Sequence, residues 1–209
     1  MPNAIFYNSY KLKKGSSVPD FLHAVEQLVT QYASKQKGVM SFMLFNDGDN
    51  WADYGLFETM EDARSFENPT STNEYAEKFY SFLNFSTCKS RMYTVKGSHQ
   101  QQSAVPKAVM YISFKLAKGV SESDFLQASE KVHSEFMSKQ KGYGSWKQLT
   151  DGKTWADLLT WESIEDAQNA MGASASSAVA HEFFAFLDPA SINSQLFSVE
   201  KYMNIKGVM

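Results

Sequence analysis

The sequence contains very little cysteine and arginine. Among its 209 residues the single cysteine, Cys88, excludes an internal disulfide and a cluster of thiolate metal ligands. We therefore expect a reducing, cytoplasmic environment. Only Arg64 and Arg91 carry the planar guanidinium that suits bidentate recognition of phosphate. Phosphate chemistry is accordingly disfavoured.

An excess of charge and a long apolar run are also missing. The 20 basic and 23 acidic residues give a net charge of -3, which offers no electrostatic footprint for nucleic acid or an anionic membrane. No apolar run approaches the ~18 residues that cross a bilayer. The start, Met1-Pro2-Asn3-Ala4, has neither the charged nor the apolar region of a secretory signal. We expect no nucleic-acid partner, no membrane and no secretory leader.

The familiar catalytic and cofactor motifs are absent as well. The sequence has no paired Cys-x-x-Cys, no zinc-type His-x-x-Glu-His, no Gly-x-Ser-x-Gly elbow, no glycine-rich phosphate loop and no dinucleotide fingerprint. It therefore predicts no bound metal, haem, flavin or nicotinamide. Cys88 has no histidine near it in sequence, so we expect a buried and inert thiol.

An internal duplication is the most informative feature that is present. Roughly a third of about ninety ungapped positions are identical between the two halves, which is far beyond coincidence. The clearest repeated segments, each offset by 104 residues, are 34–38 with 138–142 and 51–53 with 155–157. We predict two units, residues 1–96 and 107–209. The polar segment 97–106 lacks periodicity, so we predict a surface linker there.

Each unit has the pattern of a β-α-β-β-α-β order. A long helix with apolar spacings of three and four follows the first strand and should end at Gly38, and its copy at Gly142, in a left-handed cap. Asp47-Gly48 and its copy Asp151-Gly152 predict hairpin turns. A second helical region begins near Glu61. The predicted strands are 5–12, 39–45, 51–57 and 92–95 in the first unit, and 109–116, 143–149, 155–161 and 196–199 in the second.

Two segments carry a resemblance to a known group. In residues 51–63 and 155–167 a third strand ends in aromatic-Glu-Ser/Thr and leads into a helix. This pattern resembles antibiotic-biosynthesis-monooxygenase-type domains, which belong to the dimeric α+β barrels. The resemblance covers both units and implies an α+β fold of two tandem ferredoxin-like units. Their antiparallel sheets would pack into one intramolecular barrel, a covalent version of the family's homodimer that is a monomer or a weak homo-oligomer.

The haem-degrading branch of that superfamily gives a more specific comparison. Its members resemble one another in an Asn on the first strand and a Trp and a His in the second helical region. Asn8 matches the first position, but Phe66 and Ala76 stand at the other two. In the second unit Ile112 replaces the Asn, and His181 lies one residue beyond the expected place. Because neither unit carries the full set, haem degradation is the less favoured alternative, and Asn8 could instead satisfy a strand-end backbone group.

None of the four histidines is repeated between the units. We expect His23 to be solvated on the first helix and His99 to lie in the linker. His133 replaces Val29 on the flank of a buried helical face. Because histidine titrates near neutrality, His133 is a candidate base, and His181 a candidate contact for a ligand.

Differences between the units predict two unequal cavities. The second unit combines aromatic walls with titratable groups, so we predict the working pocket there. Asp157 and Trp155 share one face of a strand, and a desolvated Asp could have the raised pKa of a base; alternatively, both are structural. The candidate catalytic residues are His133 and Asp157, and the candidate substrate-binding residues are Tyr111, Trp146, Trp155, His181 and Asn8.

Three classes of function remain open from the sequence. The resemblance implies a cofactor-independent monooxygenase that deprotonates an aromatic or apolar metabolite in a dry pocket. The first alternative is a non-catalytic binder of a small apolar ligand in the barrel cavity. The second is a structural or interaction module without chemistry.

Overall fold

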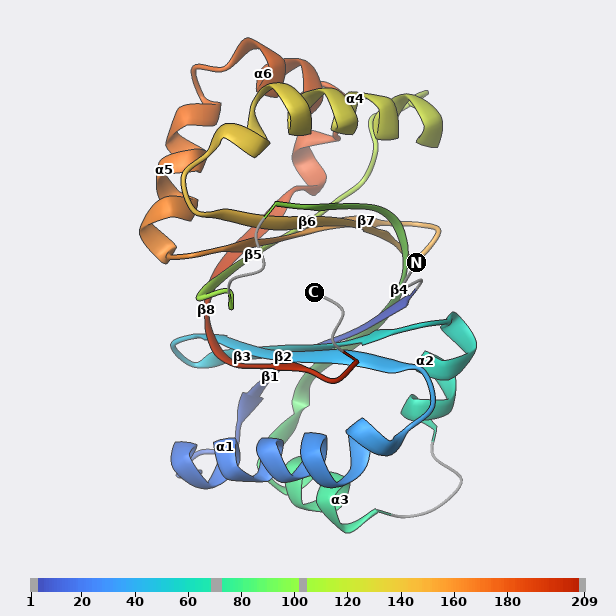
Figure 1. Ribbon diagram of the computed structural model, residues 1–209, viewed down its shortest axis with the longest axis vertical. Coiled ribbons are helices and arrows are strands. Elements are labelled where there is room, and N and C mark those ends of the chain that lie inside the picture. Colours follow the sequence, from blue (N-terminus) through green and yellow to red (C-terminus); the bar gives the residue numbers. More distant parts are fainter. Residues whose placement is uncertain (1–3, 69–72, 102–104, 207–209) are drawn as a thin grey trace. The chain divides into compact units, whose positions relative to one another are not determined.

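The protein is described here as a computed structural model covering residues 4–68, 73–101 and 105–206 (Figure 1). Helices and strands alternate in the same order in both halves of the chain. The first half contains β1 (Ala4–Leu12), α1 (Val18–Gln27), the π-helix η1 (Leu28–Tyr32), the 3-10 helix η2 (Ala33–Lys35), β2 (Val39–Asp47), β3 (Asn50–Phe57), α2 (Met60–Glu67), α3 (Glu74–Ser81) and β4 (Leu83–Gln100). The second half contains β5 (Ala108–Phe114), α4 (Glu122–Glu135), the 3-10 helix η3 (Met137–Lys139), β6 (Tyr143–Thr150), β7 (Trp155–Trp161), α5 (Ile164–Ser174), α6 (Ala178–Phe184), the 3-10 helix η4 (Pro189–Ser191) and β8 (Asn193–Asn204).

The eight strands are hydrogen-bonded in one closed antiparallel sheet. Their order is β1-β3-β2-β8-β5-β7-β6-β4. This confirms the predicted fold class, an α+β protein built from βαββαβ units whose strands join in one closed sheet. None of the helices in the described ranges is long and apolar enough to cross a membrane.

The chain forms two compact units that exchange strand ends. Among the described residues, the first unit consists of 4–94 with 200–206, and the second unit of 95–199. These boundaries differ from the predicted units 1–96 and 107–209, because residues 95 and 96 belong to the second unit and residues 200–206 to the first. Residues 97–100 are not a linker but the end of β4, and Gln101 donates its backbone N–H to Gly144 at 2.9 Å. Gly97 fits there because a β-carbon at this position would collide with the Gln148 side chain.

The fourth strand of each half is much longer than predicted. Only 92–95 and 196–199 are apolar enough to indicate a strand, whereas β4 and β8 continue through residues that are alternately exposed and half-buried. Backbone hydrogen bonds hold these polar ends, and Ile205, the residue after β8, donates its N–H to the Met40 carbonyl on β2 at 2.9 Å. A pattern of apolar residues could not reveal them.

Glycine and a capping side chain fix the junction between helix and sheet, and only the glycine was predicted from the sequence. Gly38 has φ +74°, and its copy Gly142 has φ +69°, so both adopt the left-handed conformation. Asp62 lies against Gly38 so closely that a β-carbon would collide with its carboxyl group. Asp62 also accepts from the Thr59 hydroxyl at 2.6 Å, while its backbone N–H donates to that hydroxyl at 3.0 Å. The start of α2 is therefore held against the end of the preceding helical segment.

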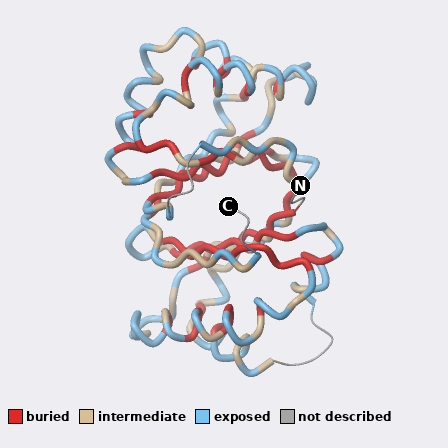
Figure 2. The backbone as a smooth tube through the Cα atoms, in the orientation of Figure 1, coloured by how far each residue is buried: buried red, intermediate tan, exposed pale blue. Residues whose placement is uncertain are grey.

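Each unit has its own aromatic core between helices and sheet. Buried residues concentrate on the strands and on the helix faces that contact them (Figure 2). In the first unit Trp51 packs edge-on against Phe21, with ring centroids 5.0 Å apart. In the second unit Trp155 and Phe125 make the same contact at 4.8 Å. The repeated tryptophans are therefore core residues.

Candidate functional site

A cavity of about 390 Å³ lies in the first unit. Its walls come from η1, η2, α2, α3 and all four strands β1–β4, and most of them are aromatic or aliphatic. On β1 the alternate residues Phe6, Asn8 and Tyr10 face the cavity, as the two-residue period of a strand requires. The volume is within the range of pockets that hold small organic ligands.

Three neighbouring strands place a chain of polar side chains on the cavity wall. The register puts Asn8 on β1 opposite Asp53 on β3 and opposite Ser90 on β4. The Ser90 hydroxyl donates to Asn8 Oδ1 at 2.7 Å, and Asn8 Nδ2 donates to Asp53 Oδ1 at 3.0 Å. These two consecutive hydrogen bonds therefore orient one oxygen of the Asp53 carboxylate.

The second oxygen of Asp53 is not held by this chain of hydrogen bonds. Asp53 is 4% exposed, and its Oδ2 has no hydrogen-bond partner among the described residues. Burial raises the pKa of Asp53 to about 6, while the Asn8 amide and the Tyr10 hydroxyl hold it down. The Tyr10 hydroxyl lies near the carboxyl, but its geometry does not satisfy the criteria for a hydrogen bond. A buried carboxyl that lines a cavity and titrates close to neutrality is suited to accept a proton.

A π-helix forms one side of this cavity. The regular helix α1 ends at Gln27, and the backbone N–H of Ala33 reaches the carbonyls of Leu28 and Val29. Leu28, Val29, Tyr32 and Ala33 all line the cavity. Such turns are rare and frequently occur at functional sites. The sequence carries no signal for it, because the equivalent residues of the second unit have no insertion or deletion and form a regular helix up to Glu135.

The cavity that contains the equivalent aspartate of the second unit, Asp157, in its wall measures only about 100 Å³. Leu159 and Met137 occupy the positions of Gly55 and Ala33 and take up part of the space. Asp157 lines this cavity, is 3% exposed, and has its pKa raised to about 7 by burial, against a small opposite effect of the Trp146 indole. The two cavities are therefore unequal, as predicted. The working pocket was predicted in the second unit, whereas the larger of these two cavities, with the polar chain, lies in the first.

Comparisons with known proteins identify the fold. No protein-family model and no curated protein matches the sequence. A crystal structure from Lactobacillus acidophilus, named a "putative monooxygenase", superposes with a TM-score of 0.68 at 9% identity, over 100% of this chain and 99% of that one. An uncharacterised ferredoxin-fold protein related to antibiotic biosynthesis monooxygenases, from Listeria monocytogenes, gives 0.56 at 11% identity, over 96% of both chains. The chain has the fold of these proteins.

A third solved structure with this ferredoxin-like fold is an anthrone oxidase-like protein. Its TM-score is 0.60 at 10% identity, over 100% of this chain and 95% of that one. At such identities the likeness establishes the fold alone, and the predicted resemblance is confirmed at that level. Chemistry has to be argued from the side chains.

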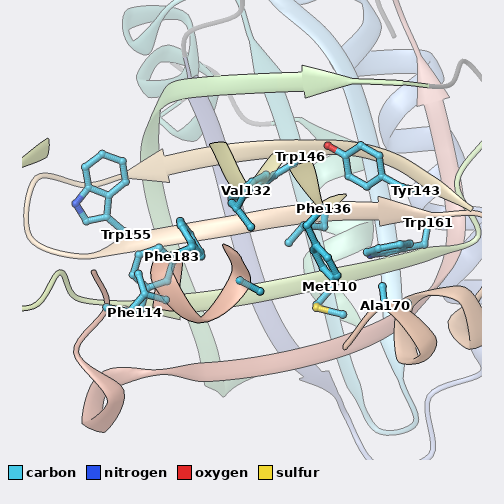
Figure 3. Packing of buried hydrophobic residues seen from close by; sticks show 14 of the residues in the cluster. Met110, Phe114, Val132, Phe136, Tyr143, Trp146, Trp155, Trp161, Ala170 and Phe183 are labelled. Atoms are coloured by element: carbon cyan, nitrogen blue, oxygen red, sulfur yellow. The ribbon is translucent and has the colours of Figure 1, made fainter. Parts of the chain in front are cut away.

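The candidate residues of the second unit are not gathered at one site. Trp146 and Asp157 line the small cavity, but Tyr111, His133, Trp155 and His181 do not. Tyr111 is buried opposite Leu158 and Gln195, on the face of β5 away from Met110 and Ile112. Trp155 belongs to the core (Figure 3). His181 is exposed on α6. Sequence position alone could not show which of these side chains face the small cavity and which face the opposite side of their strand or helix.

His99 was also predicted wrongly, because it is not in a linker. Its side chain is 9% exposed and stacks on His133, with ring centroids 4.0 Å apart and planes at 17°. His99 Nε2 lies 3.6 Å from the Glu130 carboxylate. Burial lowers the pKa of both histidines, and the nearby His99 lowers that of His133 further. The pair therefore fastens the end of β4 to α4 while uncharged.

Cys88 lies on the wall of the larger cavity. It was expected to be buried, but it is only partly buried. Its sulfur is 3.6 Å from the carbonyl oxygen of Asn84. Burial, together with the charge of Asp53, raises the pKa of the thiol. The thiol therefore stays protonated near neutral pH and is a poor nucleophile.

The residues of the larger cavity do not fit haem. Within the described part of the chain its lining offers no imidazole for iron and no Lys or Arg for propionates. Asn8, the residue shared with the haem-degrading branch, is already engaged by Asp53 and Ser90. Over the described ranges, no group of three or more His, Cys, Asp or Glu side chains gathers to hold a metal ion. The available chemistry is therefore that of a carboxylate among aromatic rings.

Proposed function

We propose that the first unit is the active site of a cofactor-independent monooxygenase that acts on a flat, electron-rich aromatic compound. The observation that carries the proposal is Asp53: a buried carboxyl with one oxygen held by Asn8 and the other unpartnered at the wall of an aromatic cavity. A pKa of about 6 leaves most of this carboxyl ionised at pH 7, yet close enough to neutrality to transfer a proton efficiently.

In the proposed reaction Asp53 is the general base. Its Oδ2 removes a proton from an acidic ring methylene or phenol of the bound substrate. Asn8 and Ser90 are positioning residues, because they hold Oδ1 and so fix where Oδ2 points. The Tyr10 hydroxyl, buried beside Asp53, donates a hydrogen bond to the oxyanion that develops on the substrate.

Molecular oxygen completes the proposed chemistry. The deprotonated substrate gives electrons to O₂, forms a carbon–oxygen bond, and loses water. A ring methylene plus O₂ becomes a ring ketone plus water, so atoms and electrons balance without a further reductant. The aromatic walls favour this step, because they exclude bulk water from a reactive carbanion.

Oxygen uptake tests the proposal. A panel of tricyclic hydroxyaromatics, with anthrone first because one structural neighbour is anthrone oxidase-like, should reveal a substrate. Asp53→Asn keeps the shape of the side chain but cannot accept the proton, so we expect kcat to fall by about 100-fold or more. Asp49→Asn, an exposed aspartate on the same hairpin, is the matched control and should retain the activity of the natural protein.

Two outcomes contradict the proposal. Full activity of Asp53→Asn would remove Asp53 as the base. Panel compounds that raise the melting temperature without consuming oxygen would replace catalysis by the non-catalytic binding function. A ligand present at 100 times its Kd adds about 2.7 kcal/mol, which a thermal-shift assay detects readily.

A further inference from the structure

The small cavity of the second unit contains an unexplained group of polar atoms. Its lining is almost wholly apolar, and Met110, Phe136 and Trp161 border the same space (Figure 3). Three buried atoms of its lining residues have no hydrogen-bond partner in good geometry among the described residues: Nε1 of Trp146, Nε1 of Trp161 and Oδ1 of Asp157. The Trp146 indole nevertheless lies close enough to Asp157 to lower its pKa slightly. All three residues line the cavity.

Such atoms are rarely left unpaired in a folded protein. Nearly all buried polar groups have a partner, and each one without a partner costs free energy. Here two donors and one carboxyl oxygen belong to residues that line a single cavity. The arrangement matches a ligand with one polar group that both accepts and donates a hydrogen bond. A hydroxyl group has this property, whereas a hydrocarbon or a tertiary amine does not.

The walls limit the size and charge of such a ligand. A dry cavity of about 150 Å³ in another protein holds benzene, and this cavity measures about 100 Å³. Three methionines in its lining, Met110, Met137 and Met171, can change rotamer and adapt to one ring. Two fused rings would not fit. Among the described residues, no Lys or Arg lines the cavity to balance an anionic ligand.

We propose that the second unit contains a separate binding site for a small neutral hydroxy compound of at most one aromatic ring, the phenol class. Its hydroxyl donates to Asp157 and accepts from an indole N–H. This site shares no lining residue with the larger cavity of the first unit. The proposal of this binding site can therefore be tested independently of the proposed oxygenase function.

Indole N–H signals provide the most direct test. The protein has four tryptophans, of which only Trp146 and Trp161 line this cavity. In a ¹H–¹⁵N spectrum, phenol should shift the indole signal of Trp146 or Trp161 in a saturable way and leave those of Trp51 and Trp155 in place. The variants Trp146→Phe and Trp161→Phe, which introduce the residues found at the equivalent positions of the first unit, assign the signals.

Affinity measurements add the chemical specificity. Phenol should bind about tenfold more tightly than toluene, which has the same size but no hydroxyl. Asp157→Leu should remove this preference, leaving toluene binding unchanged or stronger. Ala170→Phe, which introduces the residue of the first unit, should fill the cavity and abolish binding. Ala173→Phe, on the exposed side of the same helix α5, is the matched control.

Three results would overturn the proposal. The first is equal affinity for phenol and toluene in the natural protein. The second is phenol binding that survives Ala170→Phe. The third is a phenol-induced shift confined to Trp51 or Trp155. If Ala170→Phe does not fold, Asp157→Leu and the indole signals still decide the question, and none of these readouts depends on oxygenase activity.

Discussion

The two units place an aspartate at the same register position and give it different surroundings. Asp53 faces Asn8 across the β1–β3 ladder, whereas Asp157 faces Ile112 across β5–β7. Tyr10 near Asp53 is replaced by Phe114 in the second unit. The donors of the first unit hold the pKa at about 6, while burial with little opposition raises it to about 7 in the second. Two substitutions on one strand are therefore enough to distinguish an oriented carboxylate from a largely unsupported one.

The space around the two aspartates differs for equally local reasons. Gly55 and Ala33 leave a large cavity beside Asp53, and the first unit widens the end of its helix into the π-helix η1. Leu159 and Met137 fill the equivalent positions beside Asp157. A duplicated fold can thus hold two cavities of different volume and polarity without an insertion or deletion.

The largest expected effect concerns the cost of ionising Asp157. Its pKa in the folded protein, about 7, is above the ordinary value of 3.8, so the folded state binds the proton more tightly than the unfolded state. The free energy of unfolding should therefore fall as pH rises from about 4 to about 7, by on the order of 2–4 kcal/mol. Asp157→Asn cannot ionise and should lack this loss.

Urea unfolding at pH 4.5 and pH 8 measures this effect. The difference between Asp157→Asn and the natural protein isolates Asp157 from all other titrating groups. For Asp53→Asn the same comparison should give a smaller change that is complete near pH 6. Identical pH slopes for Asp157→Asn and the natural protein would show that Asp157 is not a costly buried charge.

Introducing a larger side chain of the second unit at the equivalent position of the first unit should fill the larger cavity. Ala33→Met introduces the equivalent residue of the second unit into the cavity wall. We expect kcat/KM for the substrate found in the oxygen-uptake panel to fall about 10- to 100-fold, because an overfilled site costs roughly 1–3 kcal/mol. Lys35→Met, exposed on the same 3-10 helix η2, should leave kcat/KM unchanged. If Ala33→Met retains its activity, catalysis occurs elsewhere.

Exchanging the polar partner should make Asp53 resemble Asp157. Asn8→Ile removes the amide that donates to Asp53 Oδ1, so the pKa of Asp53 should move up from about 6 toward the value of about 7 at Asp157. A base acts when deprotonated, so the activity rises with pH, and its midpoint should move upward in the variant. The expected loss is about fivefold at pH 6 and much smaller at pH 8. A pH–rate profile with an unchanged midpoint would exclude Asp53 as the titrating base.

The smallest effect concerns the histidine pair that only the second unit possesses. Burial lowers the pKa of His99 and of His133, so the folded state binds their protons less tightly than the unfolded state. Stability should therefore be lost as pH falls below the ordinary histidine range near 6.5. His133→Val, the residue of the first unit, should remove part of this loss. We expect under about 1 kcal/mol, because the pair is partly solvated and Glu130 partly compensates.

Melting temperatures at pH 5 and pH 8 test the histidine prediction. His23→Val, at an exposed histidine of α1, is the control and should leave the pH dependence as it is. The same acid sensitivity in His133→Val and the natural protein would mean that the stack does not fasten β4 to α4.

The duplication made most of the fold predictable. Two copies of each strand, hairpin turn and glycine cap test one another, and Gly38 and Gly142 have the predicted positive φ. The site was less accessible to sequence reasoning. Asn8 and Asp53 are 45 residues apart, and their meeting depends on a strand register that no local pattern encodes. The π-helix and the buried position of His99 likewise depend on tertiary contacts rather than on residue type.

The exchange of strand ends has a consequence for biosynthesis. The neighbour of β2 in the first unit is the end of β8, where Glu200 accepts from Asn46 at 3.0 Å. These two residues are 154 positions apart, and a ribosome adds roughly 5–20 residues per second. About 8–30 s therefore pass between the synthesis of β2 and the synthesis of the strand end that pairs with its edge. During that interval the unfinished first unit presents an unpaired strand edge, the kind of surface on which aggregation begins.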